Sequence, residues 1–232
     1  MRKGADFFSL CFERNIIMKT YNTILFDLDG TLTDPGLGIT NSVMYALKKY
    51  GIEVSDRSEL YKFIGPPLAE SFEKYYGFST EESYKAVDCY REYYRDRGLY
   101  ENTVYDGIED LLKELKAEGK TLIVATSKPE VFAKEVLRHF GLDKYFEYIA
   151  GGNLDGTRTV KAEVIAYALD SCGITDKENA VMVGDRMHDI VGAKTVGIDS
   201  IGVLFGYGSR EELENAGADY IAEGVENIKY YT

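Results

Sequence analysis

The chain has 232 residues, of which 45% are hydrophobic, so it can form one large domain or one domain with a small insert. Its net charge of −12 argues against nucleic acid and against an anionic membrane surface as partners, because both attract basic patches. The three cysteines, Cys11, Cys89 and Cys172, lie far apart and have no zinc-binding or disulfide spacing. We therefore expect free thiols in a reducing cytoplasm.

The first segment of the chain has no pattern typical of a folded element. The apolar run within residues 1–17 is broken by Glu13 and Arg14 and is too short for a signal-peptide core or a membrane span. We expect residues 1–17 to form an N-terminal extension outside the fold, with Met18 as an alternative start.

Apolar runs typical of buried strands then alternate with amphipathic helical segments. The predicted strands are Thr23–Leu28, Thr121–Ala125, Tyr145–Ala150, Ala180–Val183, Ser200–Leu204 and Asp219–Ala222. The predicted helices between them are Gly107–Glu118, Pro129–Phe140, Val160–Cys172 and Asp189–Val196. This alternation predicts an α/β fold, a Rossmann-like doubly wound parallel sheet with helices on both faces.

One interval, from about Gly38 to Tyr100, breaks the alternation because it has helical patterns and no convincing strand. Its helical segments are Ile39–Tyr50, Pro67–Tyr76 and Glu81–Arg97. We expect an all-helical cap domain, residues 37–102, inserted after strand one into an α/β core domain of residues 18–36 and 103–232. Such an insert would lie above the carboxyl edge of the sheet, where open α/β sheets bind ligands.

The most informative stretch is the end of the first strand, where an apolar run stops at Asp27 and Asp29 and is followed by Gly30 and Thr31. Because side chains alternate along a strand, both carboxylates lie on the same side of the strand end. Buried strands usually end in neutral turn residues. A pair of carboxylates at this place indicates a cation site or a role in proton transfer.

Three further polar segments follow predicted core strands along the chain. Thr126 and Ser127 end the second strand, and Lys161 begins a helix. Asp185 and Asp189 follow the fourth strand. In a parallel sheet these strand ends share one edge, so the groups can meet there.

Four aspartates at one edge need a cation. Two like charges about 4 Å apart repel by about 4 kcal/mol at an effective dielectric constant near 20, and a phosphate dianion adds to this repulsion. Mg²⁺ suits such a site because it binds oxygen ligands and joins one or two carboxylates to a substrate phosphate. Lys161, the Thr126 hydroxyl and the backbone N–H groups around Gly30 can bind phosphoryl oxygens. Asp27 is then left for nucleophilic attack and Asp29 for proton transfer.

At these residues the chain resembles the haloacid dehalogenase superfamily, whose four motifs occur in order. The motifs are Asp27-x-Asp29-Gly30-Thr31-x-x-Asp34, Thr126, Lys161 and Gly184-Asp185-x-x-x-Asp189. The resemblance implies that Asp27 is the nucleophile and Asp29 the acid/base. It also implies that Mg²⁺ is bound by Asp27, the backbone carbonyl of Asp29 and Asp185, with Asp189 assisting. The residues expected to bind the substrate phosphate are Gly30, Thr31, Thr126, Ser127 and Lys161.

The helical insert, with the segments Phe63–Leu68 and Gly184–Ile190, resembles the phosphoglycolate phosphatase and 5′-nucleotidase branch of this superfamily. Asp29 argues against the dehalogenases, which lack this second aspartate. The leading hypothesis is a Mg²⁺-dependent phosphatase that hydrolyses a small phosphorylated metabolite through a phospho-aspartate. The alternatives are a phosphosugar mutase resembling β-phosphoglucomutase and a non-catalytic phosphate-binding regulator. A phosphonatase would need an additional cap lysine, and the insert contains several lysines. The core motifs identify neither the substrate nor the oligomeric state.

Several residues have a purely structural alternative. Thr126 and Ser127 could cap the following helix, and Lys128 could take the place of Lys161. In the insert, residues 65–67 could be a turn between helices or a loop that reaches the substrate. Four tyrosines could line a substrate pocket or pack the insert, namely Tyr84, Tyr90, Tyr93 and Tyr94.

Overall fold

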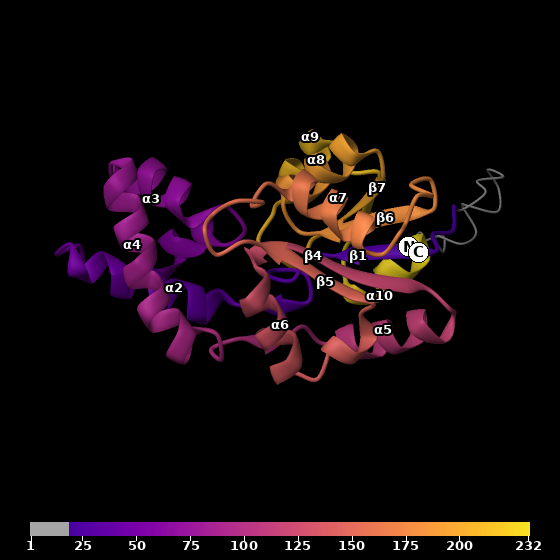
Figure 1. Cartoon of the computed structure of the whole chain (residues 1–232), viewed down its shortest axis with the longest axis horizontal. Coiled ribbons are helices and arrows are strands. Elements are labelled where there is room, and N and C mark those ends of the chain that lie inside the picture. Colours follow the sequence, from indigo (N-terminus) through magenta and orange to yellow (C-terminus); the bar gives the residue numbers. More distant parts are fainter. Residues whose placement is uncertain (1–18) are drawn as a thin grey trace, which may run out of the picture.

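The centre of the molecule is a six-stranded sheet with strand order β5-β4-β1-β6-β7-β8, in which every neighbouring pair of strands is parallel (Figure 1). The computed structural model describes residues 19–232, so the predicted extension of residues 1–17 lies outside the described residues. The strands are β1 (Thr23–Phe26), β4 (Thr121–Pro129), β5 (Tyr148–Gly152), β6 (Ala180–Gly184), β7 (Asp199–Val203) and β8 (Tyr220–Ala222). The predicted doubly wound α/β fold is confirmed.

The chain builds this sheet outward from β1 in two directions. It passes from β1 to β4 and β5 on one side, and then crosses back to β6, β7 and β8 on the other. The strand order therefore reverses between β1 and β6, and such a switch point opens a crevice at the carboxyl ends of the strands. Asp27 follows β1 and Asp185 follows β6, so the topology brings the two carboxylates to the same crevice.

Helices cover both faces of the sheet (Figure 1). They are α5 (Ile108–Ala117), α6 (Glu130–His139), α7 (Lys161–Ser171), α8 (Met187–Val196), α9 (Arg210–Ala216), α10 (Val225–Ile228) and the 3-10 turns η3 (Asp143–Tyr145) and η4 (Lys229–Tyr231). Alternation along β1 divides the core, because Ile24 and Phe26 pack with α5, α6 and α10, whereas Leu25 packs with α7 and α8. Burial on both faces explains the continuous apolar sequence of this strand.

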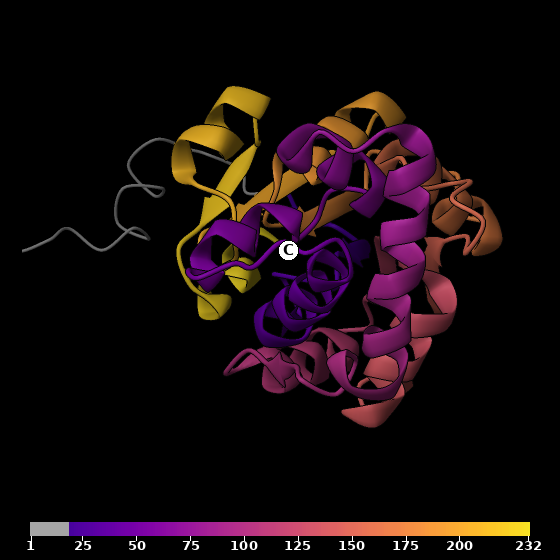
Figure 2. The same cartoon turned by 90° about the vertical axis from the view of Figure 1, so that its left-hand side faces the viewer.

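A group of helices lies beyond the carboxyl ends of the strands, at the left of Figure 1 and toward the viewer in Figure 2. Its elements are α2 (Gly36–Lys49), the 3-10 helix η1 (Arg57–Phe63), α3 (Leu68–Tyr76), α4 (Thr80–Tyr93) and the π-helical turn η2 (Tyr94–Gly98). The predicted all-helical cap is thereby confirmed, while its boundaries at residues 37 and 102 stay a prediction.

The helix predicted over residues 81–97 is divided in two. A capping box fixes its start, because Ser79 and Glu82 exchange side-chain to backbone hydrogen bonds of 2.9 and 3.3 Å. The α-helix ends at Tyr93 and widens into η2, in which the Leu99 N–H donates to the Tyr94 carbonyl at 2.8 Å. Such π-turns are frequent at functional sites, and this one carries Tyr94.

A short antiparallel ribbon, not predicted from the sequence, joins the cap to the sheet domain. Its strands are β2 (Thr33–Asp34) and β3 (Thr103–Val104), in which Thr33 pairs with Val104 and Asp34 with Thr103. Two residues per strand are too few for an alternating pattern to be recognised. Elsewhere β4 continues to Pro129, beyond the predicted end at Ala125. None of the helices within residues 19–232 combines the length and the apolar character that a membrane span requires.

Candidate active site

Three carboxylates meet at the switch point of the sheet. Asp27 follows β1, Asp185 follows β6, and Asp189 lies in the first turn of α8. One oxygen from each lies within 4.8 Å of the others, and each residue is at most 4% exposed. The structure thus brings together the aspartates of the first and fourth predicted motifs.

Lys161, the first residue of α7, joins this cluster. Its Nζ lies 2.9 Å from Asp27 Oδ1 and 2.7 Å from Asp189 Oδ1, and it donates to the Ala125 carbonyl at 3.2 Å. Burial lowers the pKa of Lys161, but Asp189 and Asp27 outweigh this effect and raise it above its ordinary value. The ammonium therefore stays charged and partly balances the carboxylates.

One ammonium does not balance three buried carboxylates. Burial, followed by repulsion from Asp189 and Asp27, raises the pKa of Asp185 well above its ordinary value. Burial also raises the pKa of Asp189, although Lys161 acts against it. A cluster of carboxylate oxygens that resists ionisation in this way is suited to a hard divalent cation, and its all-oxygen donor set fits Mg²⁺.

Glycines allow the chain to close around Asp185. Gly30 has φ +84°, and a Cβ there would lie 2.3 Å from Asp185 Oδ2. A Cβ on Gly206 would lie 2.4 Å from Asp185 Cβ, and one on Gly208 would lie 1.9 Å from the Asp185 carbonyl oxygen. The Thr31 hydroxyl donates to Asp185 Oδ1 at 3.4 Å. Of the predicted phosphate-binding residues, Thr31 thus contacts this carboxylate directly, and Gly30 leaves the space that the carboxylate occupies.

Tyr207, which the sequence analysis did not assign to the site, connects Asp185 to the cap. Its N–H donates to Asp185 Oδ2 at 2.7 Å, and its hydroxyl donates to Asp34 in β2. Its ring packs edge-on against Tyr61 of η1, with centroids 5.6 Å apart. The pattern Gly206-Tyr207-Gly208, which begins three residues after the end of β7, is the sequence signal that marks this loop.

Asp29 lies apart from the three-carboxylate cluster and has its own cation. Lys128 Nζ donates to both of its oxygens, at 2.8 and 2.7 Å. Burial raises the pKa of Asp29, and Lys128 partly offsets the effect. The two lysines weighed in the sequence analysis therefore have different partners, since Lys161 contacts Asp27 and Lys128 contacts Asp29. Lys128 Nζ also lies 5.0 Å from the ring centroid of Tyr94 in the cap.

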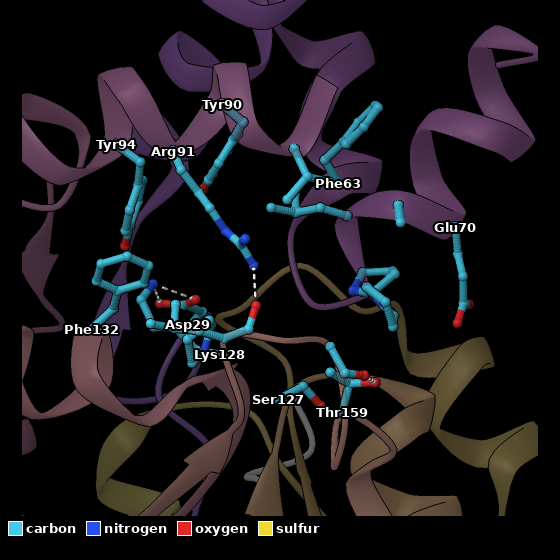
Figure 3. Close-up of a pocket in the computed structure, with 18 of the residues that line it drawn as sticks. Asp29, Phe63, Glu70, Tyr90, Arg91, Tyr94, Ser127, Lys128, Phe132 and Thr159 are labelled. Atoms are coloured by element: carbon cyan, nitrogen blue, oxygen red, sulfur yellow. Dashed lines mark hydrogen bonds and ion pairs between the residues drawn. The ribbon is translucent and has the colours of Figure 1, made fainter. Parts of the chain in front are cut away.

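A cavity of about 370 Å³ lies between these groups and the cap. Asp27, Asp29, Thr126 and Ser127 line it from the sheet side. Thr126 is 2% exposed, and its hydroxyl accepts from the Lys128 N–H at 3.3 Å. From the cap, Figure 3 shows Tyr90, Arg91 and Tyr94 reaching down from α4 and η2. Further cap residues in the lining are Phe63, Gly65, Pro66, Pro67, Leu68, Glu70 and Tyr84.

The structure also shows which of the four cap tyrosines line the cavity. Tyr84, Tyr90 and Tyr94 line the cavity, whereas the Tyr93 hydroxyl donates to Glu101 at 2.9 Å and Tyr93 is absent from the described lining. Residues 65–67 line the cavity as well. The exposed side chain of His188 belongs neither to this lining nor to the carboxylate cluster.

Two hydrogen bonds connect the cap to the loops of the core. Arg91 Nη2 donates to the Leu154 carbonyl at 2.8 Å, across the cavity (Figure 3). Arg186 Nη1 donates to the Ile64 carbonyl at 2.6 Å. Sequence analysis missed both contacts. The lining residues Tyr84, Val87, Tyr90 and Tyr94 follow one another at intervals of three or four residues. This helical spacing indicates which side of α4 and η2 faces the cavity.

Carboxylates and a lysine lie at the switch point of a doubly wound sheet, and a helical cap covers them. These features together define the class of protein. The chain belongs to the haloacid dehalogenase-like hydrolases, whose family model matches residues 24–203. Enzymes of this family that act as phosphatases generally use a divalent metal, and the cluster of Asp27, Asp185 and Asp189 fits one.

Individual relatives show which members of this family the chain is similar to. A 5′-nucleotidase of Pseudomonas aeruginosa is 54% identical over 193 residues, which are 83% of this chain and 87% of the relative. Tyrosine-protein kinase PtkA of Mycobacterium tuberculosis is 41% identical over 203 residues, 87% of this chain and 68% of the relative. The solved structure of a predicted phosphatase from Clostridium acetobutylicum has a TM-score of 0.88 and 52% identity, and the match covers 90% of this chain and 97% of that one. The prediction of a phosphoric monoester hydrolase of this family is confirmed.

Proposed function

We propose that the protein is a Mg²⁺-dependent phosphatase that hydrolyses a small phosphomonoester through a phospho-aspartate at Asp27. The observation that carries this proposal is the contact of Lys161 with both Asp27 and Asp189, inside a buried cluster of three carboxylates. Such a cluster is costly for folding, which supports a functional reason for it.

The metal would be held by Asp27, Asp185 and Asp189, with the backbone carbonyl of Asp29 as a further oxygen donor. When bound, Mg²⁺ supplies positive charge that offsets the carboxylates and the substrate phosphate. Lys161 adds a permanent positive charge beside Asp27. Thr126 and Ser127 in the cavity lining can donate their hydroxyl hydrogens to phosphoryl oxygens.

Asp27 is oriented for attack on phosphorus. Its Oδ1 accepts the Leu28 N–H at 2.7 Å and contacts Lys161 at 2.9 Å, so the carboxylate is held in one orientation. A carboxylate oxygen of Asp27 forms a bond to phosphorus while the ester bond from phosphorus to the leaving oxygen breaks. Holding the nucleophile in this way lowers the entropic part of the barrier.

Asp29 is suited to transfer the proton that the leaving oxygen takes up. Its raised pKa brings the carboxyl closer to neutral pH, where it can give a proton to the leaving oxygen and then take one from water. That water attacks phosphorus, the bond from Asp27 to phosphorus breaks, and inorganic phosphate is released. Enclosure of Asp29 under the cap keeps bulk water from this exchange.

The substrate is a small phosphorylated metabolite. Relatives at 54%, 31% and 28% identity carry the names 5′-nucleotidase, pyrophosphatase and phosphoglycolate phosphatase. Within the described residues Cys89 and Cys172 are free thiols, which supports a cytoplasmic location.

The experiment is release of inorganic phosphate from a panel containing p-nitrophenyl phosphate, nucleoside monophosphates, phosphoglycolate and pyrophosphate. We expect release with Mg²⁺, loss of release with a chelator, and recovery when Mg²⁺ is added back. Release that persists in the chelator contradicts the metal site. A phosphosugar isomerised without free phosphate would indicate a mutase, and no turnover of any compound would indicate a non-catalytic binder.

A further inference from the structure

The cap side of the cavity carries information about the leaving group. We propose that the substrate is a phosphomonoester with an uncharged, aromatic leaving group that accepts hydrogen bonds, as a nucleoside 5′-monophosphate has, and that Arg91 selects it. This inference rests on the proposed phosphatase function and adds the substrate class and the specificity residue. Three observations carry it: the charge of the lining, its aromatic character, and two polar groups that are available to a ligand.

The charge of the lining disfavours a second anionic group on the substrate. The acidic lining residues within residues 19–232 are Asp27, Asp29, Glu70 and Asp155, and the basic ones are Arg91 and Lys128. Lys128 already contacts both oxygens of Asp29, and Arg91 lies 3.6 Å from Asp88. A carboxylate or second phosphate on the substrate would therefore meet acidic side chains, while both basic lining residues already have an acidic neighbour.

The shape and composition of the wall favour a ring. Tyr90 and Tyr94 are stacked, with centroids 5.3 Å apart and planes at 16°, and Phe132 meets Tyr94 edge-on at 5.5 Å. All three are at most 8% exposed, so the wall is held in place by packing. Aromatic walls bind nucleobases through stacking and edge contacts. A volume of about 370 Å³ falls within the usual range for drug-sized ligands, and phosphoglycolate or pyrophosphate would leave much of it empty.

Arg91 is placed to recognise hydrogen-bond acceptors on that ring. In Figure 3 its side chain extends from α4 into the cavity. Its Nη2 donates to the Leu154 carbonyl at 2.8 Å. A guanidinium has five N–H donors, so others remain for a ligand. Leu154 is 39% exposed, so water can replace Arg91 at its carbonyl if the ligand takes that contact.

The Tyr94 hydroxyl is a second polar group available to a ligand. Tyr94 is 2% exposed, and its hydroxyl has no hydrogen-bond partner among the side chains and backbone groups that the structure describes. Figure 3 shows it pointing from the cap toward Asp29 and Lys128, the region that the leaving group would cross. A buried hydroxyl without a partner costs free energy, which a polar atom of the ligand would recover.

The first test compares kcat/KM of the full chain with Mg²⁺ for adenosine 5′-monophosphate, uridine 5′-monophosphate, phosphoglycolate, pyrophosphate and p-nitrophenyl phosphate. We expect at least one nucleotide to exceed both phosphoglycolate and pyrophosphate by about tenfold or more. The inference is overturned if either of those two equals or exceeds both nucleotides, or if only p-nitrophenyl phosphate is hydrolysed; the phosphatase function survives both results. No release from any compound overturns the function itself.

The second test uses Arg91→Gln. We expect KM for the preferred nucleotide to rise about tenfold with little change in kcat, and its kcat/KM relative to phosphoglycolate to fall about tenfold, because one charge-assisted hydrogen bond is lost. Arg97→Gln is the matched control, since Arg97 is exposed, belongs to η2 and is absent from the described cavity lining. An equal loss for every substrate, or no loss, overturns the role of Arg91.

Two further variants keep the test informative if Arg91→Gln fails to fold. Arg91→Lys keeps the charge and the apolar stem but removes the planar fork, so we expect a smaller rise in the nucleotide KM. Tyr94→Phe keeps the ring and its packing, and we expect a rise of a few-fold in the same KM. If neither variant changes the nucleotide KM, the proposed recognition is wrong.

Discussion

The two sides of the cavity differ in how their side chains are held. On the sheet side, charged groups contact one another directly, as Lys161 does with Asp27 and Asp189 at 2.9 and 2.7 Å. On the cap side, aromatic rings pack together and the polar ends of Arg91 and Tyr94 stay available to a ligand. The sheet side therefore has the features of a fixed reaction centre, and the cap side those of a surface that selects what enters. Variants on each side should accordingly change different kinetic constants.

The largest expected effect is at Asp27, the proposed nucleophile. Asp27→Asn removes the attacking oxygen anion, and we expect kcat to fall by roughly a thousandfold or more on every substrate. Asp110→Asn, at an exposed residue of α5, is the control and should keep wild-type kcat. Substantial turnover by a folded Asp27→Asn protein would show that another group attacks phosphorus, and the division into reaction centre and selecting surface would fail.

The next largest effect is expected from moving Asp185, a proposed metal-binding carboxylate. Gly208→Ala would place a Cβ 1.9 Å from the Asp185 carbonyl oxygen, so the backbone at Asp185 must shift. We expect kcat to fall about a hundredfold and the Mg²⁺ concentration for half-maximal activity to rise. Gly119→Ala is the comparison, because a Cβ there meets nothing within 4 Å, and it should change stability without changing Mg²⁺ activation. Equal Mg²⁺ requirements in both variants would contradict the role of this loop.

A smaller effect is expected on the pH profile. Lys128 lowers the pKa of Asp29, so Lys128→Met should raise this pKa further. The limb of the kcat profile that reports Asp29 should then move to higher pH, with a few-fold loss at neutral pH. Lys134→Met, which removes a lysine paired with Glu130, is the control. If this limb of the profile does not move, or moves to lower pH, Asp29 is not the group that transfers the proton.

The smallest expected effect is on the thermal stability of the metal-free protein. A carboxyl whose folded pKa lies above its unfolded value favours folding when protonated, and that contribution is lost as pH rises through the folded pKa. The pKa of Asp185 is raised in this sense, so at neutral pH ionisation of this carboxyl is less favourable in the folded than in the unfolded protein, which opposes folding of the metal-free protein. Asp185→Asn should therefore raise the Tm of the metal-free protein by about 2–4 °C, for a gain of about 1 kcal/mol. A lower Tm in thermal unfolding would show that the cluster stabilises the fold without metal.

Most of the sheet side of this comparison could be predicted from sequence. On the cap side the sequence offered residues 65–67 and four tyrosines as candidates, without deciding which of them line the cavity. Asp27 and Asp185 directly follow β1 and β6, and Lys161 and Asp189 lie in the first turns of the helices that come after β5 and β6. Parallel topology therefore brings all four to one edge of the sheet, independently of the loops between them. The doubly wound fold followed from the alternation of apolar runs with helical segments, and the helical insert followed from the interval that breaks this alternation.

Contacts between distant segments escaped prediction for physical reasons. Arg91 contacts Leu154 because the cap lies over the loop after β5. The hydrophobic periodicity of the sequence does not specify how the cap is oriented relative to the sheet. Lys128 reaches Asp29 because β4 extends to Pro129, several residues beyond its apolar run. The widening of α4 into η2 at Tyr94 depends on tertiary packing and leaves no mark on the helical pattern.

The most direct test of the central claim is to locate the phosphoryl group during turnover. Wild-type protein with Mg²⁺ and a radiolabelled substrate is quenched in acid within one turnover, digested, and analysed by mass spectrometry. The account predicts label on the peptide that contains Asp27, and none on that peptide in Asp27→Asn. Turnover without a labelled peptide, or label on a tyrosine instead of Asp27, would contradict it.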